Sequence, residues 1–193
     1  MGLWLIKRFE RLIRRYSLIE KTPFIDTRQL PRGDGLEANW LVIPGRELEQ
    51  VLADRERRPN FQEISKDQTN INITKDDHWK TFFLFAHSFS VAAVCVRCPQ
   101  TAKLITAIPG MFTSFFSILS PGKHIPPHRG PCNGLLRARL GMIVPEPAEH
   151  CRIEVGSEIR HRQTGKVIVF DGTYRHQVWN DTDGTRVVLF LDI

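Results

Sequence analysis

Two histidines and three arginines in the C-terminal half of the chain have the residue types and spacing of a metal site beside an anion site. His128 follows the pair Pro126-Pro127, and His176 lies in the β-rich stretch R-H-Q-V-W. Imidazole nitrogens are common metal ligands, and guanidinium groups bind carboxylates through paired hydrogen bonds. A single histidine beside prolines is more often a loop residue, so only the combination indicates a site. The arginines are Arg137, Arg139 and Arg186.

Two of these arginines alternate within one apolar run. Arg137 and Arg139 stand in L-L-R-A-R-L-G, and successive side chains of a strand point to opposite faces. Both are therefore expected on the same face, which is either exposed to solvent or lines a site for an anion. Arg186 begins the last apolar run, R-V-V-L-F-L-D-I.

Short β-rich runs separated by turn residues fill the chain from residue 111 onward. Glycine, proline and aspartate mark the turns between them, as at Ser120-Pro121-Gly122 and Asp183-Gly184. This pattern predicts a sandwich, jelly roll or small barrel. The runs cover residues 111–119, 135–144, 151–155, 166–170, 175–179 and 186–193.

The N-terminal half is predicted to be mainly helical. The patterns favour helices over 37–57, broken at Pro44-Gly45, and over 99–108, with a buried strand over 81–86. The expected organisation is one compact domain over 1–193. It has a basic amphipathic helix and extended loop over 1–30, a helical or mixed part over 31–110 packing on the core, and a β core over 111–193.

Charge and cysteine content narrow the class of protein. The formal net charge is +6, and residues 1–30 hold seven basic against three acidic residues, so the rest of the chain is nearly balanced. This argues against a nucleic-acid-binding domain. The four cysteines form no secreted disulfide framework, which favours the cytoplasm. The amphipathic segment 1–20 docks on the protein itself or a partner, or else makes peripheral contact with the inner face of a membrane.

Several pieces of the chain, in this order and spacing, resemble the aspartyl/asparaginyl β-hydroxylase family. They are His128-Arg129-Gly130-Pro131, the stretch K-V-I-V-F-D-G-T-Y-R-H-Q-V-W-N and the closing T-R-V-V-L-F-L-D-I. The resemblance runs from about residue 75 to the end of the chain. It implies a mainly β fold with N-terminal helices, built on a double-stranded β-helix (a cupin-like jelly roll). It also implies an Fe(II)- and 2-oxoglutarate-dependent dioxygenase that uses O2.

The resemblance implies roles for particular residues. His128 and His176 are expected to be the catalytic, metal-binding histidines, and Arg186 to bind the distal carboxylate of 2-oxoglutarate. Ser117 and Arg137 are expected to contact the same cosubstrate, and so is Arg139, although the aspartyl hydroxylases carry a histidine at its position. Gly130 occupies the place where the wider superfamily has a carboxylate ligand, so this metal site is expected to have two protein ligands.

The substrate is left open at this point. The resemblance implies hydroxylation of an unactivated carbon in a protein Asp or Asn side chain, a small molecule or a lipid acyl chain. The basic N-terminal segment favours a membrane-associated substrate, as for a lipid A-type acyl-chain hydroxylase, whereas Gly130 favours the amino-acid type. Two alternatives from other classes are a non-catalytic β-sandwich that binds an acidic ligand through its arginines, and a membrane-surface adaptor.

Overall fold

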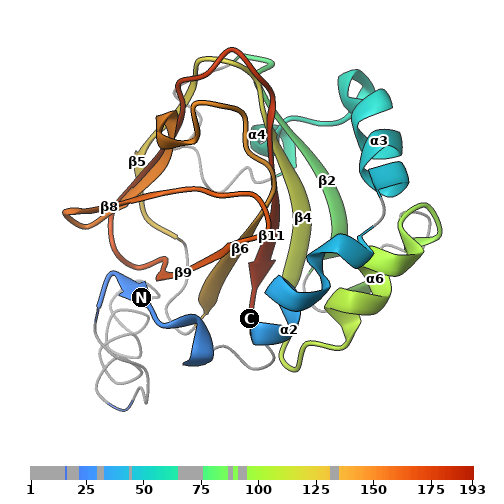
Figure 1. The fold of residues 1–193 in the computed structure, drawn as a ribbon, viewed down its shortest axis with the longest axis horizontal. Helices are drawn as coiled ribbons and strands as arrows, with labels where there is room; N and C mark the ends of the chain where they lie inside the picture. The colour runs from blue at the N-terminus through green and yellow to red at the C-terminus, as the bar shows by residue number, and fades with distance from the viewer. Residues whose placement is uncertain are drawn as a thin grey trace, which may run out of the picture.

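The structure, a computed structural model, consists of two antiparallel sheets with helices on one side (Figure 1). The predicted N-terminal helix lies outside the described residues, apart from Tyr16. Among the helices that are described, none has the length and apolar character needed to cross a membrane. The described residues are 16, 22–29, 33–43, 45–64, 76–86, 89–90, 95–130 and 135–193.

The sheets are the two halves of a jelly roll, as the sequence predicted. All their strand pairs are antiparallel. The large sheet has the order β1 (Phe24–Ile25), β9 (Val167–Asp171), β6 (Leu136–Ile143), β11 (Arg186–Asp192), β4 (Thr113–Leu119), β2 (Trp79–Ala86) and β3 (Phe89–Ser90). The small sheet has the order β5 (Lys123–His128), β10 (His176–Asn180), β7 (Cys151–Val155) and β8 (Glu158–His161).

Helices cover the face of the large sheet that points away from the small sheet (Figure 1). The break predicted at Pro44-Gly45 is confirmed, since a new helix begins at Gly45. The Glu47 carboxylate accepts hydrogen bonds from the backbone N–H groups of Gln100 and Thr101, and so joins two of these helices. The helices on this face are α2 (Gly33–Asn39), α3 (Gly45–Ala53) and α6 (Pro99–Thr106), whereas Phe61 of α4 (Phe61–Ile64) packs in the core between the sheets. The 3-10 turns are Thr27–Gln29, Trp40–Val42, Arg55–Arg57 and Ala148–His150.

The large sheet separates two hydrophobic cores. Ala138 and Leu140 of β6 face the helices, whereas Phe170 and Ile153 pack in the space between the sheets. In each strand the side chains alternate between these two cores. Arg137 and Arg139, the neighbours of Ala138 in β6, therefore lie on the side of the space between the sheets.

Four strands were missed by the sequence pattern: β1 and β3, which have two residues each, and β5 and β8. β5 contains Pro126 and Pro127, and β8 is exposed along its whole length, so neither shows apolar alternation. Proline lacks an N–H donor and is tolerated in a sheet only at an edge, which is where β5 lies. The large sheet also begins earlier than the boundary at residue 111, because β2 pairs along β4.

Asn180 joins the two sheets at one end of the space between them. Its side chain is fully buried, and Nδ2 donates to the carbonyls of Leu119 (3.3 Å), Ser120 (2.9 Å) and Gly184 (2.9 Å). Its Oδ1 accepts a hydrogen bond of 2.7 Å from the Thr182 hydroxyl. This one side chain thus satisfies backbone groups of both the β4–β5 turn and the β10–β11 turn.

Replacing Asn180 by aspartate is expected to destabilise the fold strongly. The new carboxylate would face three carbonyl oxygens without a donor, and an unsatisfied buried polar group costs about 1–3 kcal/mol, more when it is charged. Urea unfolding measures the loss. The matched control is Asn39→Asp, since exposed Asn39 makes one local hydrogen bond to Gly35. Equal stability of the two variants would show that Asn180 does not hold the sheets together.

Candidate active site

The two predicted histidines face each other across the small sheet. His128 is the last residue of β5, His176 is the first of β10, and the two are paired in register. Their ring centroids are 4.2 Å apart, with 57° between the ring planes. His176 is 3% exposed, and His128 is half-buried. The pair therefore lies inside the jelly roll, where the sequence alone left each of them as a possible loop residue.

Backbone carbonyls fix the tautomer of both rings. His128 Nδ1 donates to the carbonyl of Pro126 at 2.8 Å, and His176 Nδ1 donates to that of Tyr174 at 2.9 Å. A carbonyl only accepts, so each Nδ1 carries the proton and each Nε2 keeps its lone pair. Such bonds also orient metal-binding histidines. Two imidazole nitrogens are thus prepared to bind a metal ion.

Both rings are held in the neutral form. Burial lowers the pKa of His128 to about 4, and the charges of Arg137 and Arg139 lower it too. Burial also lowers the pKa of His176 to about 2, assisted by the neighbouring His128 and the same arginines. Neutral imidazole is the form that binds a metal. These histidines are therefore already deprotonated at neutral pH, so no proton has to leave before they bind a metal ion.

Arg137 and Arg139 do share one face, as predicted, and that face lines the interior. Both are buried, at 7% and 3% exposure, and so are not a solvated face. Arg139 donates to the carbonyls of Ala138 and Leu191 and lies 3.2 Å from Asp192 Oδ1. Its donors are therefore largely satisfied within the protein. A contact of Arg139 with the cosubstrate stays a prediction.

Arg137 reaches the histidine pair. Its Nη1 lies 3.4 Å from His176 Nε2, and its Nε lies 3.8 Å from Asp192 Oδ1. Its guanidinium is packed between two glycines. A Cβ atom on Gly130 would come 2.5 Å from Arg137 Nη2, and one on Gly172 would come 2.6 Å from Arg137 Cδ. Because Gly130 has no side chain, the guanidinium of Arg137 occupies the space beside it.

Arg186 is buried without a carboxylate partner among the described residues. It is 2% exposed, its Nη1 makes one long hydrogen bond of 3.3 Å to the Trp179 carbonyl, and its Nε has no partner. Burial, and then the charge of Arg162, lowers its pKa, yet a guanidinium keeps its proton in proteins. A buried cation of this kind is stabilised by an anion, so Arg186 is a candidate to bind an acidic group of a ligand.

Ser117 lies on the same interior face, two residues from Leu119, which pairs with Arg186. Trp79 Nε1 donates to its Oγ at 3.0 Å. Since the indole is a donor only, the hydroxyl hydrogen of Ser117 is left to point at another acceptor. Trp79 and Ser117 therefore present a donor toward the space that Arg186 also faces.

Several residues around the site were not found from the sequence. Trp79 and Asp192 were read as a core or rim residue and a structural or surface residue, and only their contacts with Ser117 and the arginines reveal them. Gly172 shows no signal by itself, because its role depends on Arg137. His124 lies in β5, stacks on Trp179 with centroids 5.0 Å apart and shares a hydrogen bond with Gln177. Asp171 serves the turn, as expected, by accepting from the Thr173 N–H.

On the described residues, the two histidines are the candidate metal ligands. No group of three or more His, Cys, Asp or Glu side chains that could hold a metal occurs in the described part of the chain. A ligand set of two neutral imidazoles leaves the other coordination positions to water or to bound small molecules. The buried arginines favour anionic groups in those positions.

The chain is similar to several known hydroxylases. Relatives include an ornithine lipid ester-linked acyl 2-hydroxylase of Rhizobium tropici, 43% identical over 183 residues, which are 95% of this chain and 64% of the relative. Human aspartyl/asparaginyl β-hydroxylase is 29% identical over 165 residues, 82% of this chain and 20% of that protein. Human aspartate β-hydroxylase domain-containing protein 2 is 30% identical over 132 residues, 64% of this chain and 35% of the relative.

Solved structures with a similar backbone include a cupin domain of an Enterobacter cloacae transcriptional regulator. It has 14% identity and a TM-score of 0.41, and the match covers 60% of this chain and 95% of that one. The model of the family described as aspartyl/asparaginyl β-hydroxylase matches residues 37–193, which include β2 and both sheets of the jelly roll. The chain therefore belongs to the aspartyl/asparaginyl β-hydroxylase family.

Proposed function

We propose that this protein is an Fe(II)- and 2-oxoglutarate-dependent hydroxylase. One observation carries the proposal: two neutral imidazoles share an interior with Arg186, a buried guanidinium that has no carboxylate partner among the described residues. Each imidazole has an Nε2 lone pair, and that of His176 accepts only a long hydrogen bond of 3.4 Å from Arg137. A metal site next to a carboxylate site is what such an enzyme requires. When bound, iron with 2-oxoglutarate and O2 supplies the oxidising power that puts one oxygen atom into a C–H bond and releases succinate and CO2.

The donor set fits a ferrous ion. Imidazole suits Fe(II), and His128 and His176 would hold it through Nε2 while Nδ1 keeps its backbone hydrogen bond. The family resemblance assigns no third protein ligand, in agreement with Gly130 and the guanidinium packed against it. A metal cation next to Arg137 would need a nearby negative charge, which a carboxylate of the cosubstrate can provide.

Arg186 and Ser117 fit the other end of a dicarboxylate. The planar guanidinium can donate two parallel hydrogen bonds to one carboxylate, which a lysine cannot do. The Ser117 hydroxyl, already accepting from Trp79, can donate a third. These residues would hold the cosubstrate and keep water away from its buried end.

For the substrate, we infer a methylene carbon next to a carbonyl group. The names of the relatives describe aspartyl β-hydroxylation and acyl 2-hydroxylation, and both reactions take place on such a carbon. Identity is 43% to the lipid acyl hydroxylase and 29% to the human aspartyl enzyme, so an ester-linked fatty acyl chain is our first candidate, and an Asp or Asn side chain the second. The substrate preference drawn from Gly130 thus gives way to the closer similarity. Membrane contact through residues 1–20 and a cytoplasmic location stay predictions.

The cofactor assignment predicts a metal-to-ligand charge-transfer band. Anaerobic addition of Fe(II) and 2-oxoglutarate to the purified protein is expected to give weak visible absorption, because the keto acid would chelate iron held by the two histidines. His128→Ala and His176→Ala should abolish the band. Arg186→Met should lower the affinity for 2-oxoglutarate about tenfold or more, so that the band becomes weaker at the same concentration of 2-oxoglutarate. His124→Ala, outside the site, is the control.

A well-folded wild-type protein that never gives the band would contradict the proposal. In that case Arg186 would serve a site for an acidic ligand without metal chemistry. Substrate class follows from a second assay, in which succinate release is measured with ornithine lipid and with an aspartate-containing peptide. Stimulation by the lipid alone would support the acyl substrate, and stimulation by the peptide alone would reverse our order of candidates.

Gly130 is predicted to be required for the position of Arg137. In Gly130→Ala the added methyl group would push the guanidinium away from His176, at a cost in stability of about 1–3 kcal/mol from overpacking. The charge-transfer band and urea unfolding measure the two effects. Gly45→Ala is the matched control, since a Cβ there meets nothing within 4 Å. If Gly130→Ala gives the same band and the same stability as wild type, the packing of Arg137 is not specific.

A further inference from the structure

Arg162 is an interior arginine to which the proposed function gives no role. It directly follows β8, whose residues Glu158–His161 are all exposed, yet it is itself only 3% exposed. Its backbone N–H donates to the Cys151 carbonyl at 2.8 Å. The chain thus turns inward at this residue, and a long cationic side chain enters the protein from an otherwise solvated hairpin.

Within the described part of the chain, no carboxylate pairs with the guanidinium of Arg162, and the buried Cys151 thiol is the group that opposes the lowering of its pKa. No ion pair joins it to a described carboxylate, and its Nε is buried without a hydrogen-bond partner. Burial lowers its pKa to about 10. Arg139 shows what a satisfied interior arginine looks like here, since it donates to two carbonyls and to Asp192. Arg162 has the unsatisfied character of Arg186 instead.

Arg162 and Arg186 meet at the same end of the space between the sheets. Cys151, whose carbonyl holds the Arg162 backbone, is paired in register with Asn180. The residue before Asn180 is Trp179, and its carbonyl accepts the 3.3 Å hydrogen bond from Arg186 Nη1. The charge of Arg162, after burial, is the next cause that lowers the pKa of Arg186.

Two like charges at one buried end are costly unless a ligand compensates for them. Removing a guanidinium from water without a partner is unfavourable, and a second cation nearby adds repulsion. One carboxylate group can accept hydrogen bonds from two arginines, because it offers about four lone-pair sites. The pair is therefore arranged for an anion and not for the stability of the ligand-free protein.

We propose that Arg162 is a second binding residue for the distal carboxylate of the cosubstrate, acting together with Arg186. The proposal rests on the proposed function, since it takes 2-oxoglutarate as the dicarboxylate. Arg162 acts on affinity and not on the reacting atoms. It also contributes to selection by charge, because a site with two guanidiniums prefers a dicarboxylate to a monocarboxylate keto acid.

The test is 2-oxoglutarate binding to the Fe(II)-loaded protein under anaerobic conditions, measured by calorimetry, together with thermal melting without ligand. Arg162→Met, of similar length and no charge, is expected to raise the Kd about tenfold or more, since hydrogen bonds between charged groups are lost. Its melting temperature without ligand should equal or exceed that of wild type, because an unpaired buried charge has been removed.

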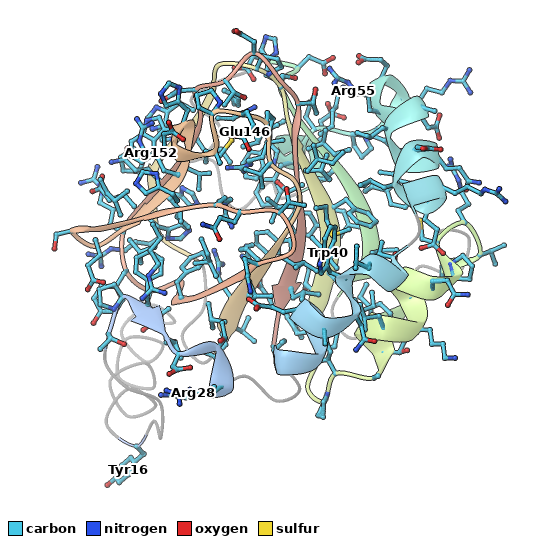
Figure 2. All side chains as sticks on the ribbon, in the orientation of Figure 1. Tyr16, Arg28, Trp40, Arg55, Glu146 and Arg152 are labelled. Carbon is cyan, nitrogen blue, oxygen red and sulfur yellow. The ribbon has the colours of Figure 1, made fainter. Side chains whose placement is uncertain are left out.

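A matched control and a second variant complete the design. Arg152→Met changes an arginine on the outer side of the small sheet, where it pairs with Asp181 at 2.8 Å (Figure 2). It should leave the Kd unchanged. Arg162→Gln keeps a polar side chain but removes the charge, and it replaces the Met variant if that variant does not fold. The same loss of affinity for 2-oxoglutarate is expected.

Two outcomes would overturn the proposal, and they are distinguishable. If wild type binds 2-oxoglutarate and the Arg162 variants bind within twofold of it, only the role of Arg162 fails. A fall in melting temperature without ligand, at unchanged Kd, would identify Arg162 as structural. If wild type itself binds no 2-oxoglutarate in the presence of Fe(II), the proposed function fails and this inference fails with it.

Discussion

An excess of buried positive charge is the constraint on which the interior of this protein depends. Four guanidiniums lie between the sheets, those of Arg137, Arg139, Arg162 and Arg186, and Asp192 is the only described carboxylate within 4.0 Å of any of them. Uncompensated buried charge opposes folding. The free energy of folding must therefore come from other interactions. These are the apolar packing on both faces of the large sheet and the hydrogen bonds of Asn180 between the two sheets.

The same charges govern the histidine pair. They help to keep both imidazoles neutral, which favours metal binding, yet they repel any divalent ion that arrives alone. A dicarboxylate removes that repulsion. Binding of the metal and of the acid are then expected to strengthen each other, and such coupling is reciprocal by thermodynamic necessity. Arg137 lies between Asp192 and His176 Nε2. It is therefore the residue expected to couple the proposed metal site electrostatically to the proposed carboxylate site.

The sequence predicted the parts of this arrangement that depend on local pattern. Alternation put Arg137 and Arg139 on one face, six apolar runs became strands, and the resemblance singled out His128, His176 and Arg186. It could not predict what depends on contacts between distant segments. Arg162 follows a polar hairpin, so its sequence context predicts an exposed side chain. The indole of Trp79 donates to Ser117, which is 38 positions away in the sequence. β5 was missed because its two prolines interrupt the strand pattern. Charge pairing in the interior becomes visible only when the two sheets are brought together.

The prolines of β5 also bear on how the protein behaves in a crowded solution. An outer strand ordinarily offers a row of backbone donors and acceptors to any other extended chain, and this is a common route to edge-to-edge aggregation. β5 is the outer strand of the small sheet, and two consecutive residues of it have no N–H to offer. The edge that carries His128 is thereby a poor template for strand addition. The strand that carries His128, a candidate metal ligand, thus also protects this edge of the sheet against self-association.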